Sequence, residues 1–158
     1  MTYLIIDADG ELHTQPATPT IDAINEAVGP EGWAFVPITY SRLMRAFVND
    51  CGLVLPDTYR RNPVGAGVLA TLGASQQPYA GPVVITGWGK HSWTEIVGLD
   101  GFLVQVVTRL HTAVTAAIGD PAAVTEFGAE WGEQIRAYAE HVRTAETPAM
   151  QFIPLGGV

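Results

Sequence analysis

The stretch YRRNPVGAGVLATLG, residues 59–73, contains the side chains best suited to hold an anion. Arg60 and Arg61 precede an Asn-Pro step, and glycines follow among helix-forming residues. A helix that begins there would offer backbone N–H groups without partners, and its dipole would favour negative charge. Forked arginine side chains would add donors for a phosphate-like group. The predicted ligand-binding residues are Arg60, Arg61, Asn62, Val64 and Gly65.

The same stretch also fits an ordinary capped helix. NPVGAG lacks the lysine and the spacing of a P-loop, and a full GxGxxG is absent. Asn62 is a good N-cap and Pro63 suits the first helical position, while the arginines can pair with surplus carboxylates. The capped helix is the favoured interpretation, and the anion site is the alternative.

The segment GWGKHSWTE, residues 87–95, is a second candidate because it gathers two tryptophans, a histidine and the chain's single lysine. Exposed aromatic and cationic side chains together often mark a binding loop. The predicted interaction residues are Trp88, Lys90, His91 and Trp93. In the alternative, which is favoured, the tryptophans cover an edge of the core while the polar residues face water.

The sequence predicts no catalytic residues, no metal ligands and no cofactor. Asp7, Asp9 and Glu11 resemble the opening of a calcium loop, but the later ligands of that loop are missing. A hairpin turn is therefore the favoured interpretation. The four histidines lack metal-binding spacing, and Cys51 has no basic neighbour in sequence to activate it as a nucleophile.

Composition narrows the partners and the cellular setting. Eight Lys and Arg against 16 Asp and Glu give a formal charge of −8, which argues against direct nucleic-acid binding. The single cysteine fits a reducing compartment, and the start MTYLIIDADG is unlike a signal peptide. The apolar run at 102–118 is interrupted and too short to span a membrane. We expect a cytoplasmic protein that does not bind membranes.

Periodicity and turn residues predict an α+β fold: a mixed, mainly antiparallel sheet with short helices, followed by a C-terminal α-helical hairpin. The expected elements are a β-hairpin at 3–15, a helix at 20–29, a strand within 32–40, two strand segments within 42–55, a helix at 63–72 and a buried strand at 81–87. Residues 1–90 are expected to form a small α+β domain. Residues 91–158 are expected to form the helical hairpin and a tail, packed with that domain as one unit.

Two late helical patterns, at 103–118 and from Asp120 to about residue 142, are separated by IGDPAA. Asp120 is expected to cap the second helix, with a proline in its first turn. Large apolar stripes on both helices predict self-association as a homodimer. The second pattern also carries an acidic row, formed by Glu126, Glu130, Glu133 and Glu140. Nearby arginines favour a solvated helix with ion pairs over an imitation of DNA.

Four segments follow one another in the first part of the chain: YLIIDADGEL, FVNDCGLVLP, Asn62 followed by VLATLG, and YAGPVVITG. They resemble, over residues 3–87, an uncharacterised domain-of-unknown-function family of phages and actinobacterial mobile elements. The insertion PVGAG after Asn62 departs from that pattern, and residues from Gly89 onward are not covered. The resemblance implies an accessory protein of a mobile element and carries over no catalytic residues.

These observations favour a non-enzymatic binding or counter-defence accessory protein that acts on a host protein or a small anionic ligand. Two alternatives stay open. One is an acidic DNA mimic that inhibits a DNA-directed enzyme. The other is a small phosphate-ligand enzyme that uses Arg60, Arg61 and a histidine, which would require these side chains to converge in a pocket.

Overall fold

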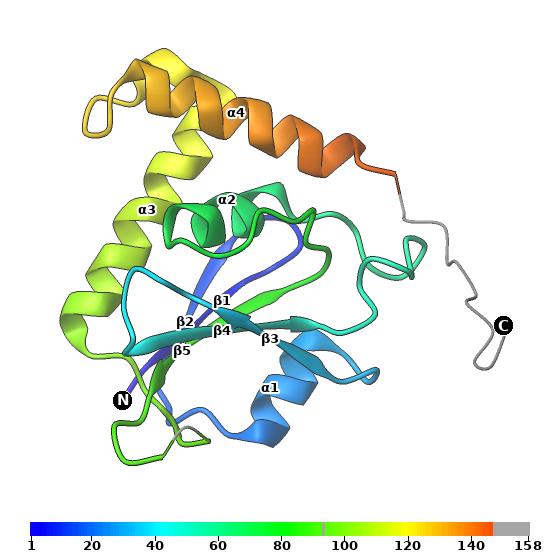
Figure 1. Cartoon of the computed structure of the whole chain (residues 1–158), viewed down its shortest axis with the longest axis vertical. Coiled ribbons are helices and arrows are strands. Elements are labelled where there is room, and N and C mark those ends of the chain that lie inside the picture. The colour runs from blue at the N-terminus through cyan, green and yellow to red at the C-terminus, as the bar shows by residue number, and fades with distance from the viewer. Residues whose placement is uncertain (93, 147–158) are drawn as a thin grey trace, which may run out of the picture.

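The computed structural model describes residues 1–92 and 94–146, which form a sheet with helices on both of its faces (Figure 1). The predicted interaction residue Trp93 lies outside the described residues, as do residues 147–158 of the predicted helical hairpin and tail at 91–158. The α+β fold predicted from the sequence, with a C-terminal helical part, is confirmed.

The sheet has six strands in the order β2-β1-β5-β4-β3, with β6 paired to β5, and its strand pairs are antiparallel. The strands are β1 (Tyr3–Ile6), β2 (Leu12–Gln15), β3 (Trp33–Pro37), β4 (Met44–Asn49), β5 (Val83–Trp88) and β6 (Ile96–Val97). β5 lies between the β1–β2 hairpin and the β3–β4 hairpin and is buried over most of its length. Its continuous apolar sequence is typical of a strand that is covered on both faces.

The turn between β1 and β2 is held by Asp7. Its Oδ1 atom accepts hydrogen bonds from the backbone N–H of Asp9 at 2.9 Å and of Glu11 at 3.0 Å, which is the usual role of an aspartate in a turn. Gly10 takes a positive φ of 87°, a conformation that glycine adopts without steric cost. These contacts support the hairpin interpretation of IIDADGE.

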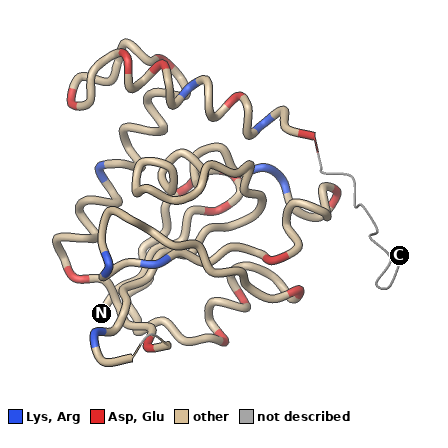
Figure 2. The backbone as a smooth tube through the Cα atoms, viewed as in Figure 1, with Lys and Arg blue, Asp and Glu red and all other residues tan. Residues whose placement is uncertain are grey.

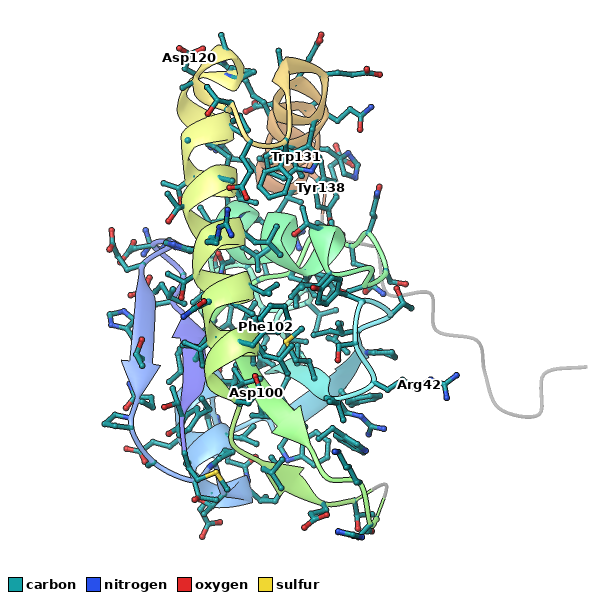
Figure 3. The ribbon with its side chains drawn as sticks, turned by 90° about the vertical axis from the view of Figure 1, so that its left-hand side faces the viewer. Arg42, Asp100, Phe102, Asp120, Trp131 and Tyr138 are labelled. Atoms are coloured by element: carbon teal, nitrogen blue, oxygen red, sulfur yellow. The ribbon has the colours of Figure 1, made fainter. Side chains whose placement is uncertain are left out.

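The helices are α1 (Ile21–Val28), α2 (Pro63–Thr71), α3 (Gly101–Gly119) and α4 (Ala129–Thr144). α1 packs alone on one face of the sheet, whereas α2 lies on the other face and contacts both α3 and α4 (Figure 1). Figure 3 shows that α4 crosses the end of α3 near Asp120, with Trp131 and Tyr138 above α2. The larger core draws on both predicted regions of the chain, from Leu4 to Val142.

Asn62 attaches α2 to the sheet. Its side chain is fully buried, and its Oδ1 atom accepts the N–H of Gly65 at 2.9 Å, as the predicted N-cap requires. Its Nδ2 atom donates to the carbonyl oxygens of Ile6 at 3.2 Å and Gly81 at 2.9 Å. One amide therefore joins the end of β1, the residues before β5 and the first turn of α2.

Two glycines let α2 lie between two layers. A Cβ atom on Gly65 would be 2.7 Å from Asn62 and 2.9 Å from Val83 of the sheet, and a Cβ on Gly67 would be 2.7 Å from Val114 of α3. A helix that is covered on all sides is apolar on all sides, as the sequence VGAGVLA is. Close packing thus explains the glycines of NPVGAG.

The segment after β4 differs from the prediction, because the second strand segment expected within 42–55 is absent. The chain forms successive turns instead: Gly52 N–H donates to Asn49, Val54 N–H to Cys51, and Thr58 N–H to a carbonyl at 55. Both edges of β4 are already paired, with β3 and β5. Local turn bonds therefore satisfy the backbone groups that a strand would have had to pair.

The second late helix also begins later than predicted. Asp120 caps only the short 3₁₀ turn η1 (Pro121–Ala123), through Ala122 N–H at 3.0 Å. Gly128 has a φ of 82° and stands at the N-cap of α4 rather than inside the helix. Gly132 does allow close approach, because a Cβ there would lie 2.6 Å from the Pro121 carbonyl oxygen.

The apolar stripes of the late helices are largely covered within the chain, although Phe127 stays 38% exposed. Leu103, Val107 and Val114 of α3 belong to the larger core, as do Ile135 and Val142 of α4. These stripes therefore no longer support self-association, and the homodimer stays a prediction. With 19 residues α3 is long and apolar enough, by length and composition alone, to cross a membrane. It contacts α2 and α4, and 22% of this apolar stretch is buried.

We predict that Asn62→Ala lowers the free energy of unfolding by about 2 to 4 kcal/mol, because it removes the N-cap and leaves buried backbone groups without partners. Asn62→Asp keeps the cap acceptor and loses the amide donor, so it should also destabilise the protein. Urea unfolding followed by circular dichroism measures both. The control is Asn25→Ala on α1, where we expect a change below about 0.5 kcal/mol. Equal effects at both positions would contradict the role of Asn62.

We predict that Gly67→Ala destabilises the protein by about 1 to 3 kcal/mol, because the added methyl group would force α3 away from α2. Gly101→Ala is the matched control: a Cβ there meets nothing within 4 Å, so the better helix propensity of alanine should leave stability unchanged or raise it. Thermal unfolding of the two variants under the same conditions makes the comparison. A stable Gly67→Ala protein would show that the layers are not closely packed.

Candidate functional site

The exposed aromatic surface lies on the face of the sheet that carries α1. This helix has only eight residues and leaves part of the face uncovered. Trp33 and Phe35 stay 37% exposed, and Ile21, at the start of α1, stays 43% exposed. An open groove of about 460 Å³ runs between them. We call it the aromatic groove, and its lining residues are Ile21, Trp33, Phe35, Arg45, Phe47, Trp88, Thr94 and Ile96.

Strand periodicity brings these side chains to one face. Trp33 and Phe35 alternate along β3, as Arg45 and Phe47 do along β4, so each pair points the same way. The intervening residues point to the other face, where Val36 joins the larger core. The register sets Phe35 opposite Phe47. The groove therefore depends on the alignment of four strands, since Trp88 comes from β5 and Ile96 from β6.

Ring contacts hold the groove in shape. The centroids of Trp33 and Phe47 are 5.2 Å apart in an edge-on arrangement, and those of Phe35 and Trp88 are 5.6 Å apart. The guanidinium of Arg45 lies 4.1 Å from the centroid of Phe35 and also over the ring of Trp88. Such pairs stabilise aromatic clusters beyond simple burial. Partial burial lowers the pKa of Arg45, yet a guanidinium remains protonated at neutral pH.

The predicted interaction residues lie on two neighbouring surfaces. Trp88 lines the aromatic groove, whereas Lys90 and His91 are exposed and line a separate open pocket of about 320 Å³ to which Trp88 also contributes. Glu95 and Asp100 lie in the same pocket. The Oε2 atom of Glu95 is buried and has no hydrogen-bond partner among the described residues. Trp88 is thus the residue that links the predicted segment to the groove.

The two predicted ligand-binding arginines make contacts within the protein. Arg60 pairs with Asp9 of the β1–β2 turn. Arg61 donates to the carbonyl oxygens of Pro78 at 3.0 Å and Ala145 at 3.1 Å. It thereby ties the end of α4 to the segment before β5.

The remaining predicted ligand-binding residues are turned toward the sheet. Asn62 and Gly65 are buried, and the N–H of Gly65 is already bound by Asn62. Val64 is half-buried and lies against Gly10, whose Cβ would be 2.7 Å from it. The first turn of α2 therefore faces the β1–β2 hairpin and β5. This arrangement supports the capped-helix interpretation, and anion binding at this turn stays a prediction.

Ion pairs interrupt the predicted acidic row. Glu126 precedes α4 and pairs with Arg109 of α3, and Glu140 pairs with Arg143 on the same helix. Figure 2 shows acidic positions spread from the α4 end of the protein to the α1 end. These features support a solvated helix with ion pairs, as the sequence favoured.

A hydrogen-bonded cluster fixes the end of α1 beside the groove. Tyr59 donates to Oε2 of Glu31, and Asn49 donates to the same atom at 2.9 Å. The hydrogen bond to Glu31 raises the pKa of Tyr59 to about 12. Hydrogen bonds from Tyr59 and Asn49 lower the pKa of Glu31. Asn49 also donates to the carbonyl of Val28 at 2.9 Å, so the cluster connects α1, β4 and the turns that follow β4.

The other displaced pKa values have equally local causes. Partial burial of Asp7 acts to raise its pKa, but hydrogen bonds from His13 and from the turn backbone outweigh burial and lower it. Burial raises the pKa of Tyr138 to about 12 and also raises the pKa of Tyr79. Arg45 is the member of this set that lines the aromatic groove. Within residues 1–92 and 94–146, no group of three or more His, Cys, Asp or Glu side chains could hold a metal ion.

Sequence reasoning missed Trp33, Phe35 and Arg45. A signal was present in GWAFVP and MRAFVN, because these segments carry apolar side chains at both alternating sets of positions. Such strands need cover on both faces. The sequence between β2 and β3 offers one eight-residue helix for the second face, which is too little to cover it.

Comparisons of the chain with family models, with curated proteins and with solved structures find no match. The resemblance of residues 3–87 to a family of phages and mobile elements therefore stays a prediction.

We predict that Glu31→Gln lowers the pKa of Tyr59 from about 12 toward its ordinary value of 10.0, because the charged acceptor is removed. Ultraviolet absorbance of the phenolate measures it, in a chain with Tyr79→Phe and Tyr138→Phe because burial also raises the pKa of those two tyrosines. The raised pKa means that this bond stabilises the fold fully below pH 10 and is lost as pH rises through 12. Glu26→Gln is the control and should leave the titration unchanged. Titration of Tyr59 near 10 in the parent chain would contradict the contact.

Proposed function

We propose that the protein is a non-enzymatic binding protein that holds an apolar segment of a host protein in its aromatic groove. The observation that carries this proposal is the exposure of Ile21, Trp33 and Phe35 around one open groove. Contiguous apolar surface commonly marks an interaction site, and aromatic side chains near the centre of an interface supply much of its binding energy.

The lining of the groove favours an extended, largely uncharged partner segment. Its walls are rings and aliphatic side chains, with the guanidinium of Arg45 stacked among them. A cationic side chain would lose hydration there without compensation, because the lining contains Arg45 and no carboxylate. Rings that are already in mutual contact need little further ordering, which lowers the cost of binding. Aromatic-lined grooves of this kind receive proline-containing extended segments in other recognition modules.

We prefer a protein partner to a small anion or a substrate because the polar groups that could bind such a ligand form hydrogen bonds within the protein. Arg60, Arg61 and Asn62 direct donors to Asp9 and to backbone carbonyl oxygens. The displaced pKa values of Tyr59 and Glu31 come from their own hydrogen bond. A site that performs acid–base chemistry would be expected to aim such groups into a cavity.

The resemblance of residues 3–87 extends the proposal to the biological setting. On that basis we propose an accessory protein of a phage or mobile element that meets its partner in the host cytoplasm. The formal charge of −8 would speed association with a basic partner and make the association rate sensitive to salt.

We predict that Phe35→Ser weakens binding of the host protein at least tenfold, because a central aromatic anchor is worth about 2 kcal/mol or more. Host protein captured by the parent chain is identified, purified and titrated by calorimetry against each variant. Phe102→Ser is the matched control, because Phe102 is 67% exposed on α3, outside the groove, and this variant should bind like the parent.

Two results would contradict the proposed function. One is undiminished binding by a folded Phe35→Ser protein, and the other is equal loss in both variants. A nucleotide that stabilises the parent chain but not a variant with Arg60 and Arg61 changed to alanine would instead favour the small anionic ligand.

A further inference from the structure

We propose that residues 147–158 of the same chain dock in the aromatic groove and occupy it until the partner segment displaces them. The inference shares its groove with the proposed function, but it needs no host protein. The two proposals can therefore fail separately.

The sequence TPAMQFIPLGGV at 147–158 has the chemistry that the groove favours. It contains no charged residue, and its large apolar side chains include Phe152 and Leu155. It also contains Pro148 and Pro154, and proline-containing segments generally lose less conformational entropy when they bind. Its composition therefore matches the extended, largely uncharged segment that the lining of the groove favours.

The described part of the chain delivers this segment to one end of the sheet. The carbonyl oxygen of Ala145 accepts a hydrogen bond from Arg61 at 3.1 Å. Arg61 in turn forms a bridge with Ala80, just before β5. The segment therefore starts beside the end of the sheet where β5 begins.

Trp33 lies at the same end of the sheet. The carbonyl oxygen of Ala80 would be 2.8 Å from a Cβ on Gly52, and Gly52 N–H donates to the carbonyl of Asn49. Asn49 is paired with Trp33 across β4 and β3. Crossing two strand spacings and one layer amounts to about 20 Å. Fully extended, the chain from Ala145 reaches about 24 Å at Phe152 and about 34 Å at Leu155, so both side chains can come to the groove when the segment is extended.

Attachment to the chain makes the segment an effective competitor. A ligand on a short flexible linker acts at an effective concentration on the order of 1 mM. A partner segment of equal intrinsic affinity would have to exceed that concentration to displace it. Only a partner that makes additional contacts would bind well. The docked segment would therefore exclude weak partners and would also shield the exposed rings from water.

Photo-crosslinking of the purified full chain tests the inference. With Phe152 replaced by p-benzoylphenylalanine, irradiation should join residue 152 mainly to the lining of the groove, within one chain, as mapped by mass spectrometry. The same probe in place of Ala137, exposed on α4, is the control and should not reach the groove. Adding Phe35→Ser should cut the yield from position 152 at least threefold, and adding Phe102→Ser should not.

Other crosslinking patterns would overturn the inference. Crosslinks from position 152 mainly to other surfaces, no crosslink above the background of the Ala137 probe, or crosslinks only between two chains would each do so. In the last case a second copy of the chain is the occupant. Where the host protein has been identified, Phe152→Ser with Leu155→Ser should tighten its binding at least threefold, and unchanged affinity would also count against competition.

Discussion

The structure depends on one buried amide. Asn62 binds the end of β1, the residues before β5 and the first turn of α2, and none of these segments is adjacent to another in sequence. In a low-dielectric interior each unmade bond would be costly, so these three segments must meet in one geometry. Gly65 allows α2 to lie against this amide, and Gly67 allows α3 to lie against α2. The packing of α2 and α3 therefore depends on a buried polar contact, whose groups could not form hydrogen bonds to water instead.

Local hydrogen bonding could be predicted from the sequence wherever a single side chain satisfies backbone groups near it. The hairpin turn at Asp7 and the cap of α2 at Asn62 were both predicted. The predicted ends of helices and strands were wrong where the backbone could satisfy its hydrogen bonds in more than one way. The residues after Asn49 form turns because both edges of β4 are taken, and α4 begins only at Ala129 because the positive φ of Gly128 is not helical. Neither fact can be read without knowing the neighbours in space.

The residues of the candidate site also divide into those that the sequence marked and those that only the structure reveals. Trp88 stood out because tryptophan beside lysine and histidine is conspicuous in any sequence. Trp33, Phe35 and Arg45 looked like ordinary strand residues, and they form a site only through the register of β3, β4 and β5. What makes this surface available is the shortness of α1, whose far end is tied down by Asn49 through Val28. The groove exists because α1 leaves part of the sheet uncovered, and this depends on how the layers pack and not on any sequence motif.

The central place of β5 has a consequence for how the chain reaches its native state. The two hairpins that flank β5 are complete before it in sequence, yet each keeps a bare edge, on β1 and on β4, until residues 83–88 insert between them. During synthesis on the ribosome these edges wait for a strand that has not yet been made. Such edges are templates for intermolecular pairing, so the interval before β5 emerges is when this protein is most exposed to aggregation and to chaperones.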